Sequence, residues 1–340
     1  MHTLHRFTAL LGLILLALSP LDALAVTVTV GGTGVKDTAG DKKWLTYQAN
    51  VEAAGDPDLE MRMLIYGELG SEDILVNGIR RGRIQVANWS GLATTTVVPE
   101  MAMLYTPFLF DNYAEADFIM DNYLFAAYSK LLAEQDVHLI QWDEIGFNQI
   151  YGKTPILAPT AAQGMRFRTS SSESARLFAE AIGADAIPLG FMDIVTGLQT
   201  GLVDSGESAI IMYVPTGISG EAKHITLTDH SFATSIIVMK KSWIDRRPEE
   251  QKRILLESFV DVNDGRQWTR DEWKTFLDEQ EKWGFTTHRI AEEQRKRWKD
   301  AVAPVSRRLI DSVGGDAQMI WDLVQEGKAA FAAQQPEDAE

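Results

Sequence analysis

Cysteine is absent from the 340 residues of this chain. Its absence excludes disulfides, thiolate ligands for a metal ion, thiol catalysis and the cysteine-linked anchor of a lipoprotein. Histidine is scarce, with six in all, and none stands in a spacing typical of zinc binding. A serine nucleophile in a G-x-S-x-G motif is also missing. We therefore expect neither an enzyme nor a protein that holds a metal ion or another cofactor.

Long apolar runs are missing except at the N-terminus. Residues 1–25 carry Arg6, then an apolar stretch at 7–18, and end in the small-residue site Ala23–Leu24–Ala25. This order is that of a secretory signal peptide, which is too short to span a bilayer. The alternative is a buried N-terminal helix. We expect cleavage near Val26, a periplasmic mature protein and no membrane insertion of the mature chain.

Positive charge is in short supply. The chain has 32 Lys and Arg against 48 Asp and Glu, which gives a net charge of −16. No basic stretch interrupts this surface, so nucleic acids and anionic membranes are not expected partners. An anionic ligand would be repelled as well and would need a local cation. About 315 residues remain after the signal peptide, which favours two domains over a single core.

Alternating strand and helix patterns run through most of the chain. The expected strands are 26–30, 59–66, 84–88, 137–142, 165–168 and one that begins at 202. The expected helices are 41–54, 71–81, 170–183 and 191–201, and the chain is mainly helical from Pro248 onward. This order predicts an α/β fold with a parallel or mixed sheet. It fits a hinged binding protein and a two-domain enzyme equally well.

Two patterns could carry chemistry but have simpler interpretations. The turn Gly31–Gly32–Thr33–Gly34 lacks the lysine of a phosphate-binding loop and the spacing of a dinucleotide fold, so we interpret it as a turn at the rim of a cleft. Asp193, Asp204 and Glu207 could form a carboxylate cluster for acid–base catalysis. Helix caps and loop hydrogen bonds are the alternative for these three residues.

The stretch G-M-R-F-R-T-S-S-S at 164–172 is more informative. In a strand, Arg166 and Arg168 point to the same face, and the strand leads directly into a helix with a predicted capping box from Ser170 to Glu173. A guanidinium at the carboxyl end of a strand, beside a helix N-terminus, is well suited to a carboxylate. The alternative is a pair of surface arginines.

Several segments together carry a resemblance to a known family. They are G-M-R-F-R-T-S-S-S, Gly183–Ala184, Ile187–Leu189, F-M-D-I-V-T-G-L-Q-T-G-L-V-D at 191–204, G-E-L-G-S-E at 67–72, P-F-L-F at 107–110, Thr228–His230 and Trp243–Pro248. In this order, over roughly residues 26 to 320, the chain resembles the DctP family, the solute-binding proteins of TRAP transporters. The run from Gly164 to Asp204 is the most specific part.

The resemblance implies a two-domain clamp fold with crossing strands and a long helix that spans both domains. The domains would be discontinuous, with 26–147 plus 234–270 in the first, 148–233 plus 271–325 in the second, and a flexible tail at 326–340. A ligand would close the cleft. The closed form would then dock on a TRAP membrane permease that is driven by a sodium gradient.

The resemblance also implies a site, and the chain departs from the family pattern within it. The carboxylate-binding arginine of the family matches Arg168, and its aromatic wall matches Phe191. A second arginine of many members falls at Asn148, and an asparagine that contacts the carboxylate falls at Ser208, which lacks the amide donor. A glutamate of the sugar-acid binders falls near Ser90.

The remaining residues expected near the ligand are apolar or carry single hydroxyl groups: Trp89, Tyr213, Thr33 and Ser172. Because these polar groups are fewer than the family pattern has, we expect a small organic acid, specifically a monocarboxylate with a partly apolar body. An ABC-type binding protein would share export and shape but not the run from 164 to 204. An exported hydrolase is the further alternative.

Overall fold

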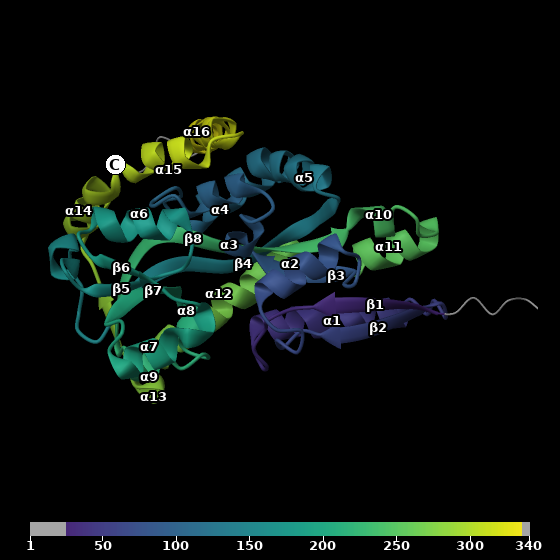
Figure 1. Cartoon of the computed structure of the whole chain (residues 1–340), viewed down its shortest axis with the longest axis horizontal. Coiled ribbons are helices and arrows are strands. Elements are labelled where there is room, and N and C mark those ends of the chain that lie inside the picture. The colour runs from purple at the N-terminus through teal and green to yellow at the C-terminus, as the bar shows by residue number, and fades with distance from the viewer. Residues whose placement is uncertain (1–24, 335–340) are drawn as a thin grey trace, which may run out of the picture.

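The computed structural model describes residues 25–334, so the predicted signal peptide lies outside the described residues apart from Ala25. One mixed sheet of nine strands runs through the described part of the chain (Figure 1), in the order β2-β1-β3-β8-β4-β7-β5-β6, with β9 paired to β8. Helices cover this sheet. The predicted α/β class and the mixed sheet are confirmed.

The first α/β unit follows the predicted order closely. It consists of β1 (Val26–Gly31), α1 (Ala39–Ala53), β2 (Leu59–Leu64), α2 (Glu72–Arg80) and β3 (Val86–Ser90). The alternating Val-Thr pattern of β1 buries Val28 and Val30, and α1 buries Trp44, Tyr47 and Val51 along one stripe. Strand β1 lies between β2 and β3 and is parallel to both, so all three strands end at the same edge of the sheet.

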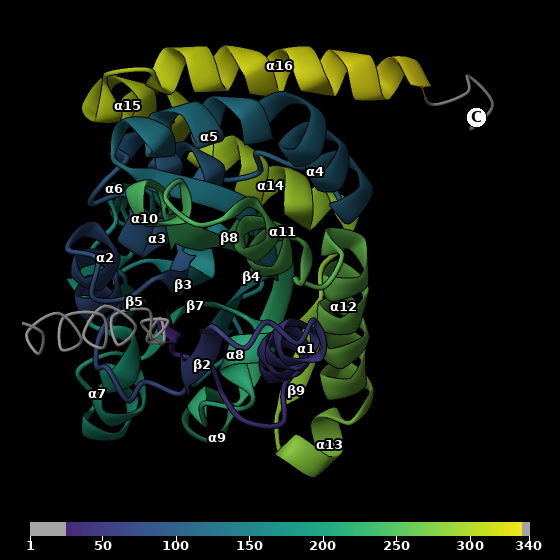
Figure 2. The same ribbon diagram turned by 90° about the vertical axis from the view of Figure 1, so that its right-hand side faces the viewer.

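Helices from two distant parts of the chain pack together beyond this unit. After α3 (Gly91–Thr94) come the 3-10 helix η1 (Pro99–Tyr105), α4 (Tyr113–Ile119), the π-turn η2 (Met120–Leu124) and α5 (Phe125–Glu134). The C-terminal part of the chain contains α14 (Glu292–Val302), α15 (Val305–Val313) and α16 (Ala317–Gln334). Helix α14 packs on β8 and on α6 (Glu173–Ala181), α15 packs on η1, and α16 lies across α4 and η2 (Figure 2).

The predicted flexible tail at 326–340 is wrong for residues 326–334, which complete α16. The ring of Phe331 lies 5.6 Å from that of Phe118, and Lys328 Nζ lies 2.8 Å from a Glu115 carboxylate oxygen. Gly327 is buried against Ile119, where a Cβ would be 3.0 Å from the isoleucine side chain. These contacts hold residues 326–334 against α4. Residues 335–340 lie outside the described part.

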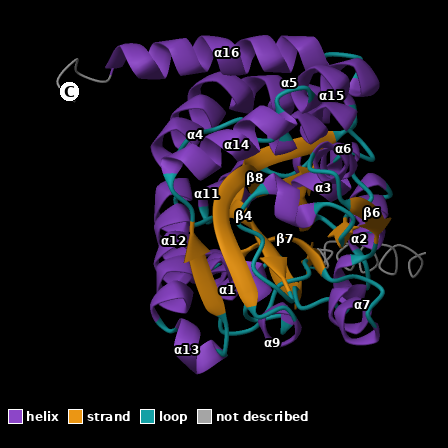
Figure 3. Ribbon diagram, turned by 90° about the vertical axis from the view of Figure 1, so that its left-hand side faces the viewer, coloured by secondary structure: helices purple, strands orange, loops and turns teal. Residues whose placement is uncertain are grey.

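Two long antiparallel strands cross the middle of the molecule (Figure 3). They are β4 (Val137–Gly152) and β8 (His224–Lys240), and both are much longer than predicted. Their pairing jumps from Asn148–Ser231 to Ile150–Thr226, so residues 227–230 bulge out of β8. The Gln149 side chain stabilises this bulge by bonding the Asp229 backbone N–H (3.0 Å) and carboxylate (2.6 Å).

The second α/β unit pairs with the other half of β4. It contains η3 (Pro159–Ala162), β5 (Arg166–Thr169), α6 (Glu173–Ala181), β6 (Asp185–Pro188), η4 (Phe191–Asp193), α7 (Ile194–Thr200), β7 (Ser205–Ala209), α8 (Ile210–Tyr213) and α9 (Ile218–Glu221). The predicted capping box at Ser170 is wrong. Ser172 is the cap, and its hydroxyl accepts a bond from the Ala175 N–H at 3.3 Å. Gly201 ends α7 in the left-handed conformation, with φ +73°, which confirms the helix end predicted at this glycine.

A long helix connects the two units. After α10 (Lys241–Ile244) and α11 (Glu249–Glu257), α12 (Val262–Asp278) contacts α1 at one end, β4 in the middle and α8 at the other end. The predicted domain-spanning helix is therefore confirmed. The short α13 (Gln280–Trp283) and β9 (Thr286–Arg289) follow it, and β9 interrupts a region predicted to be mainly helical. No helix of residues 25–334 is long and apolar enough to cross a membrane.

Candidate ligand-binding site

Arg168 is the central residue of the site. It lies near the carboxyl end of β5 and exposes only 7% of its surface, while its Nε donates to the Leu189 carbonyl at 3.0 Å. None of the salt bridges formed by the described residues involves Arg168. Burial lowers the pKa of its guanidinium, and the nearby Tyr151 and Glu207 offset only part of this effect. Since buried charges in proteins are normally paired, this cation is available to an anionic ligand.

Arg166, two residues earlier in the same strand, has a different environment. It is exposed, and its Nε and Nη2 both donate to the Asp204 carboxylate at 2.8 Å. This bidentate pair occupies the guanidinium. Of the two arginines that the strand pattern placed on one face, only Arg168 remains for a ligand.

A glycine separates Arg168 from a buried tyrosine. Arg168 pairs with Gly206 of β7, and Gly206 pairs with Tyr151 of β4, so the three residues form one row across the sheet. A Cβ at Gly206 would collide with the Tyr151 hydroxyl. That hydroxyl is buried without a hydrogen-bond partner among the described residues, and burial raises the pKa of Tyr151, so the group stays a proton donor. The row therefore places a guanidinium and a free hydroxyl side by side.

The next residue of β7 points to the opposite face. Glu207 Oε2 lies 2.7 Å from His230 Nε2, and His230 Nδ1 lies 2.7 Å from the Thr228 hydroxyl. His230 is fully buried and stacks on Phe178 with 4.3 Å between the ring centroids. This hydrogen-bonded chain connects β7 to the bulge of β8, directly behind the strand that carries Gly206.

Three hydroxyl groups mark the start of α6, immediately after Arg168. Ser172 caps the helix, Ser170 donates to the Ser172 hydroxyl at 2.9 Å, and Ser172 and Ser174 lie 3.2 Å apart. Ser172, predicted to be near the ligand, thus orients the turn between β5 and α6. Its hydroxyl is already bonded within the protein.

The predicted residues of the first unit lie at the carboxyl ends of its parallel strands. Ser90 ends β3, and both its N–H and its hydroxyl donate to the Glu72 carboxylate, at 2.8 and 2.9 Å. Trp89 is fully buried, and its indole N–H has no hydrogen-bond partner in the described part of the chain. Thr33 follows β1, is exposed and forms an isolated bridge with Tyr66.

The other predicted residues lie in the second unit and differ in how close they are to Arg168. Phe191 begins η4, is 36% exposed and follows Leu189, the residue that bonds Arg168. Ser208 lies on the same side of β7 as Gly206, and its hydroxyl donates to the Ala209 carbonyl at 3.2 Å. Asn148 donates to the Ser231 hydroxyl at 3.0 Å. It pairs with Ala209, so its side chain lies on the face of the sheet opposite to Gly206 and Ser208.

Tyr213 packs against Tyr151 and is not part of the row formed by Arg168, Gly206 and Tyr151. It is fully buried, donates its hydroxyl to the Ala222 carbonyl at 2.6 Å and stacks on Tyr151 at 6.1 Å. Sequence reasoning did not identify Tyr151 itself or the bond between Glu207 and His230. No motif distinguishes Tyr151, because only strand register brings it next to Arg168. For the second pair, the motif Thr228–His230 could have directed attention to the histidine.

The other polar groups considered from the sequence have structural partners. Asp204 pairs with Arg166, and Glu207 pairs with His230. His224 and His288 bond each other with 3.1 Å between ring nitrogens. Within residues 25–334, no three histidine or carboxylate side chains lie together in a way that could hold a metal ion. Arg168 therefore differs from these groups, because it has no carboxylate partner among the described residues.

The chain is similar to several known periplasmic binding proteins. The chain is 24% identical over 252 residues to the 2,3-diketo-L-gulonate-binding periplasmic protein YiaO of Escherichia coli, covering 72% of this chain and 75% of that one. It is 22% identical over 293 residues to the ectoine-binding periplasmic protein TeaA of Halomonas elongata, covering 82% and 83%.

Among solved structures, the sugar acid binding protein DctPAm of Advenella mimigardefordensis in complex with galactonate has the same fold. Its TM-score is 0.83 at 21% identity, over 90% of this chain and 100% of that chain. The model of the family described as bacterial extracellular solute-binding protein, family 7, matches residues 36–312. The chain therefore belongs to this family, DctP, of solute-binding proteins.

Proposed function

We propose that this protein is the periplasmic receptor of a TRAP transporter, which binds a small organic acid and delivers it to a membrane permease without itself acting as an enzyme. The observation that carries this proposal is the buried Arg168 guanidinium, which has no carboxylate partner among the described residues. A ligand carboxylate would supply the missing charge through two parallel N–H···O bonds. Two of the relatives named above bind sugar acids, which is consistent with a carboxylate ligand.

We further propose a monocarboxylate with a partly apolar body. Arg168 is the one arginine available at this edge, because Arg166 is paired with Asp204. Asn148 uses one of its two amide N–H groups within the protein, and Ser208 uses its hydroxyl. The partly exposed ring of Phe191 offers an apolar surface beside Arg168. A second carboxylate on the ligand would find fewer donors than the first.

Closure of a cleft is the mechanism that we propose for capture. The proposed first domain is 26–147 plus 234–270 and the second is 148–233 plus 271–325. The boundaries within β4 and β8 fall close to the pairing shifts at Glu144–Gly146 and Asn148–Ile150. Apolar clusters around Tyr47 in the first unit and around Tyr213 in the second are separate, while a third and larger cluster, with Trp89 and Phe178, joins the two units. A ligand shifts such a hinge only if it contacts both domains in the closed form.

A ligand screen tests the proposal. The protein is heated with a panel of small aliphatic, aromatic and sugar mono- and dicarboxylates, and with the matching amides. A bound acid raises the melting temperature in a concentration-dependent way. We expect one or more monocarboxylates to do so and their amides not to. Equal stabilisation by an acid and its amide would contradict a carboxylate receptor, as would a panel without any hit.

Solution scattering tests the clamp. With a saturating acid from the screen, the radius of gyration should decrease relative to the free protein. An unchanged radius with a bound ligand would argue against closure, although it would leave the carboxylate site intact.

A further inference from the structure

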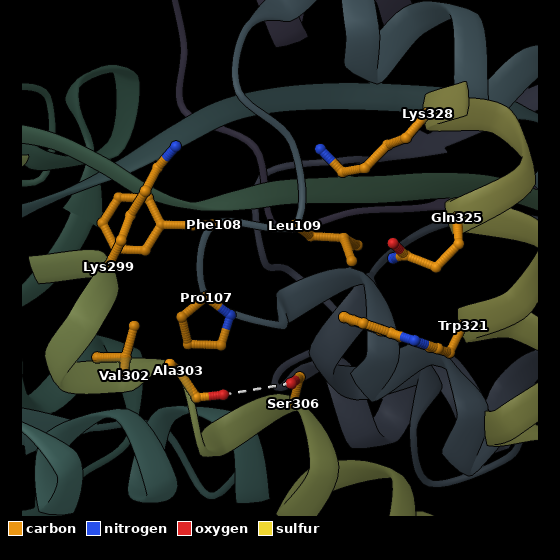
Figure 4. A pocket seen from close by; sticks show the side chains of 10 residues that line it. All are labelled: Pro107, Phe108, Leu109, Lys299, Val302, Ala303, Ser306, Trp321, Gln325 and Lys328. Atoms are coloured by element: carbon orange, nitrogen blue, oxygen red, sulfur yellow. Dashed lines mark hydrogen bonds between the residues drawn. The ribbon is translucent and has the colours of Figure 1, made fainter. Parts of the chain in front are cut away.

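Figure 4 shows a cavity of about 260 Å³, and no residue of β5 lines it. Three segments enclose it: the loop 107–109 between η1 and α4, the junction of α14 and α15 at 299–306, and one face of α16 at 321–328. None of the residues that we expect to bind the transported acid lines it. Its volume is slightly below the range of roughly 300–1,000 Å³ typical of pockets for drug-sized ligands, so it suits a small molecule.

The walls combine apolar surface with cations. Phe108, Leu109 and the indole of Trp321 form apolar parts of the wall. The chain of Lys299 lies beside the Phe108 ring, and Lys328 lies apart from it on α16 (Figure 4). A pocket that is mainly apolar with a few convergent polar groups is typical of a binding site for a small organic molecule.

The charges beside this cavity do not balance. Asp111 accepts contacts from Lys299 (2.6 Å), Lys328 (3.6 Å) and Arg295 (3.9 Å), and Glu115 pairs with Lys328 at 2.8 Å. Three cations thus share two carboxylates. Although burial opposes it, these cations hold the pKa of Asp111 below its usual value. Arg295 lies next to the cavity rather than in its lining, 5.1 Å from the centre of the Phe108 ring, and its Nη1 group is buried without a hydrogen-bond partner among the described residues. The three cations exceed the two carboxylates by one positive charge.

The loop that lines the cavity also contacts the bulge behind the ligand-binding row. Phe108 has φ +54°, a left-handed conformation that is unfavourable for a bulky side chain. Its N–H donates to the His230 carbonyl at 2.7 Å, and His230 bonds Glu207. Pro107 lines both this cavity and a small one bounded by Glu207 and His230. A molecule in the cavity would therefore touch Pro107 and Phe108, and Phe108 is bonded to His230, which in turn bonds Glu207 of β7.

We propose that this cavity is a second binding site for a small carboxylate with an aromatic or otherwise apolar body, separate from the site at Arg168. The surplus positive charge attracts the carboxylate, and Phe108 and Trp321 hold the apolar body. Occupancy stabilises the strained loop at Phe108 and, through the bond to His230, the bulge of β8.

Benzoate is the probe, and Arg168→Ala is the background, so that binding at the first site does not contribute. Calorimetric titration should show one saturable site for benzoate, with benzamide weaker by at least roughly tenfold. Hydrogen–deuterium exchange of the same protein should show slower exchange in peptides covering 106–110 and 226–232 when benzoate is present.

A cavity-filling variant and a matched control complete the test. Ala303 is exposed and lines the cavity, so Ala303→Phe blocks it without changing the core, while Ala53→Phe places the same side chain at an exposed position on α1. We expect Ala303→Phe to abolish benzoate binding and Ala53→Phe to leave it unchanged. If Ala303→Phe does not fold, Lys299→Gln should weaken binding instead. The proposal is overturned by no saturable binding in the Arg168→Ala background, by binding that survives these cavity variants, or by equal affinity for benzamide.

Discussion

Two regions of this molecule contain buried or half-buried arginines, Arg168 on β5 and the pair Arg266 and Arg270 on α12, and they differ in what surrounds the guanidinium. On α12, Arg266 bonds the Asp121 carboxylate at 2.6 and 2.8 Å, and Arg270 bonds both Glu144, at 2.5 and 2.9 Å, and Asp117. At the end of β5, Arg168 bonds only a backbone carbonyl.

The pKa shifts of these arginines run in opposite directions. Burial acts against the charged form in both regions. At Arg266 and Arg270 the hydrogen bonds and charges of the neighbouring carboxylates outweigh burial and raise the pKa. At Arg168 burial prevails and lowers the pKa. An arginine whose own chain supplies the carboxylate stabilises the fold, whereas one without that carboxylate is left for a ligand. Four predictions test this contrast, beginning with the largest expected effect.

Removal of the α12 cation should destabilise the fold. Arg270→Met leaves the Glu144 carboxylate, whose side chain is 2% exposed, without its two guanidinium donors. Breaking one partner of a buried ion pair costs about 3–5 kcal/mol, so the free energy of unfolding in urea should fall by this order. The double variant Arg270→Met/Glu144→Leu should recover most of it. The same substitution at Arg253, an exposed arginine paired with Glu250, is the control and should cost little. An Arg270→Met protein as stable as the wild type would contradict the structural role of the α12 arginines.

Removal of the β5 cation should affect binding rather than folding. For an acid identified in the screen, Arg168→Ala should weaken binding at least roughly thirtyfold, because losing a charge-assisted bidentate contact costs about 2–5 kcal/mol. Arg168→Lys should recover little, since an ammonium group lacks the planar fork. Titration calorimetry on these variants and on Arg166→Ala decides the matter. If Arg168→Ala binds as the wild type does while Arg166→Ala does not, the anchor is Arg166.

A smaller effect is expected from the neighbour of Arg168 in the row. Tyr151→Phe removes a hydroxyl that has no partner among the described residues, so the free energy of unfolding should not fall. If that hydroxyl donates to the ligand carboxylate, binding should weaken by about 1.5–3 kcal/mol, or roughly ten- to a hundredfold, because the acceptor is charged. Unchanged affinity would restrict the anion site to Arg168 alone.

The smallest effect concerns pH at the α12 region. Burial raises the pKa of Glu144 more than Arg270 lowers it, so the folded protein holds this proton more tightly than the unfolded chain does. Stability from this group is therefore gained as the pH falls and lost as it rises through the raised pKa. The destabilisation by Arg270→Met should shrink between neutral pH and about pH 5, because a protonated Glu144 needs no cation. Urea titrations of the wild type and of Arg270→Met at both pH values measure this destabilisation. A larger loss of unfolding free energy at the lower pH would contradict a raised pKa of Glu144.

Local patterns predicted the elements whose stability is local. Strand β1 followed from its Val-Thr alternation, α1 from its apolar stripe, and the end of α7 from Gly201. The patterns failed where tertiary contacts decide. Strands β4 and β8 continue through polar residues such as Asp143 and Asn148, because each strand satisfies the backbone of the other. Helix α16 extends through residues predicted to be a tail because Phe331 and Lys328 find partners on α4.

The sequence by itself determined the α/β class and a pair of candidate arginines beside a helix N-terminus, because strand alternation and residue chemistry are local properties. The resemblance carried by the run from Gly164 to Asp204 is what matched Arg168 to the family's anchor. Only the tertiary structure decided which of two arginines is free. Arg166 finds Asp204, 38 residues later, whereas Arg168 is buried beside Gly206 and Tyr151 through pairings with two other strands. Burial and charge pairing depend on segments that are distant in the chain, and a local pattern does not contain them.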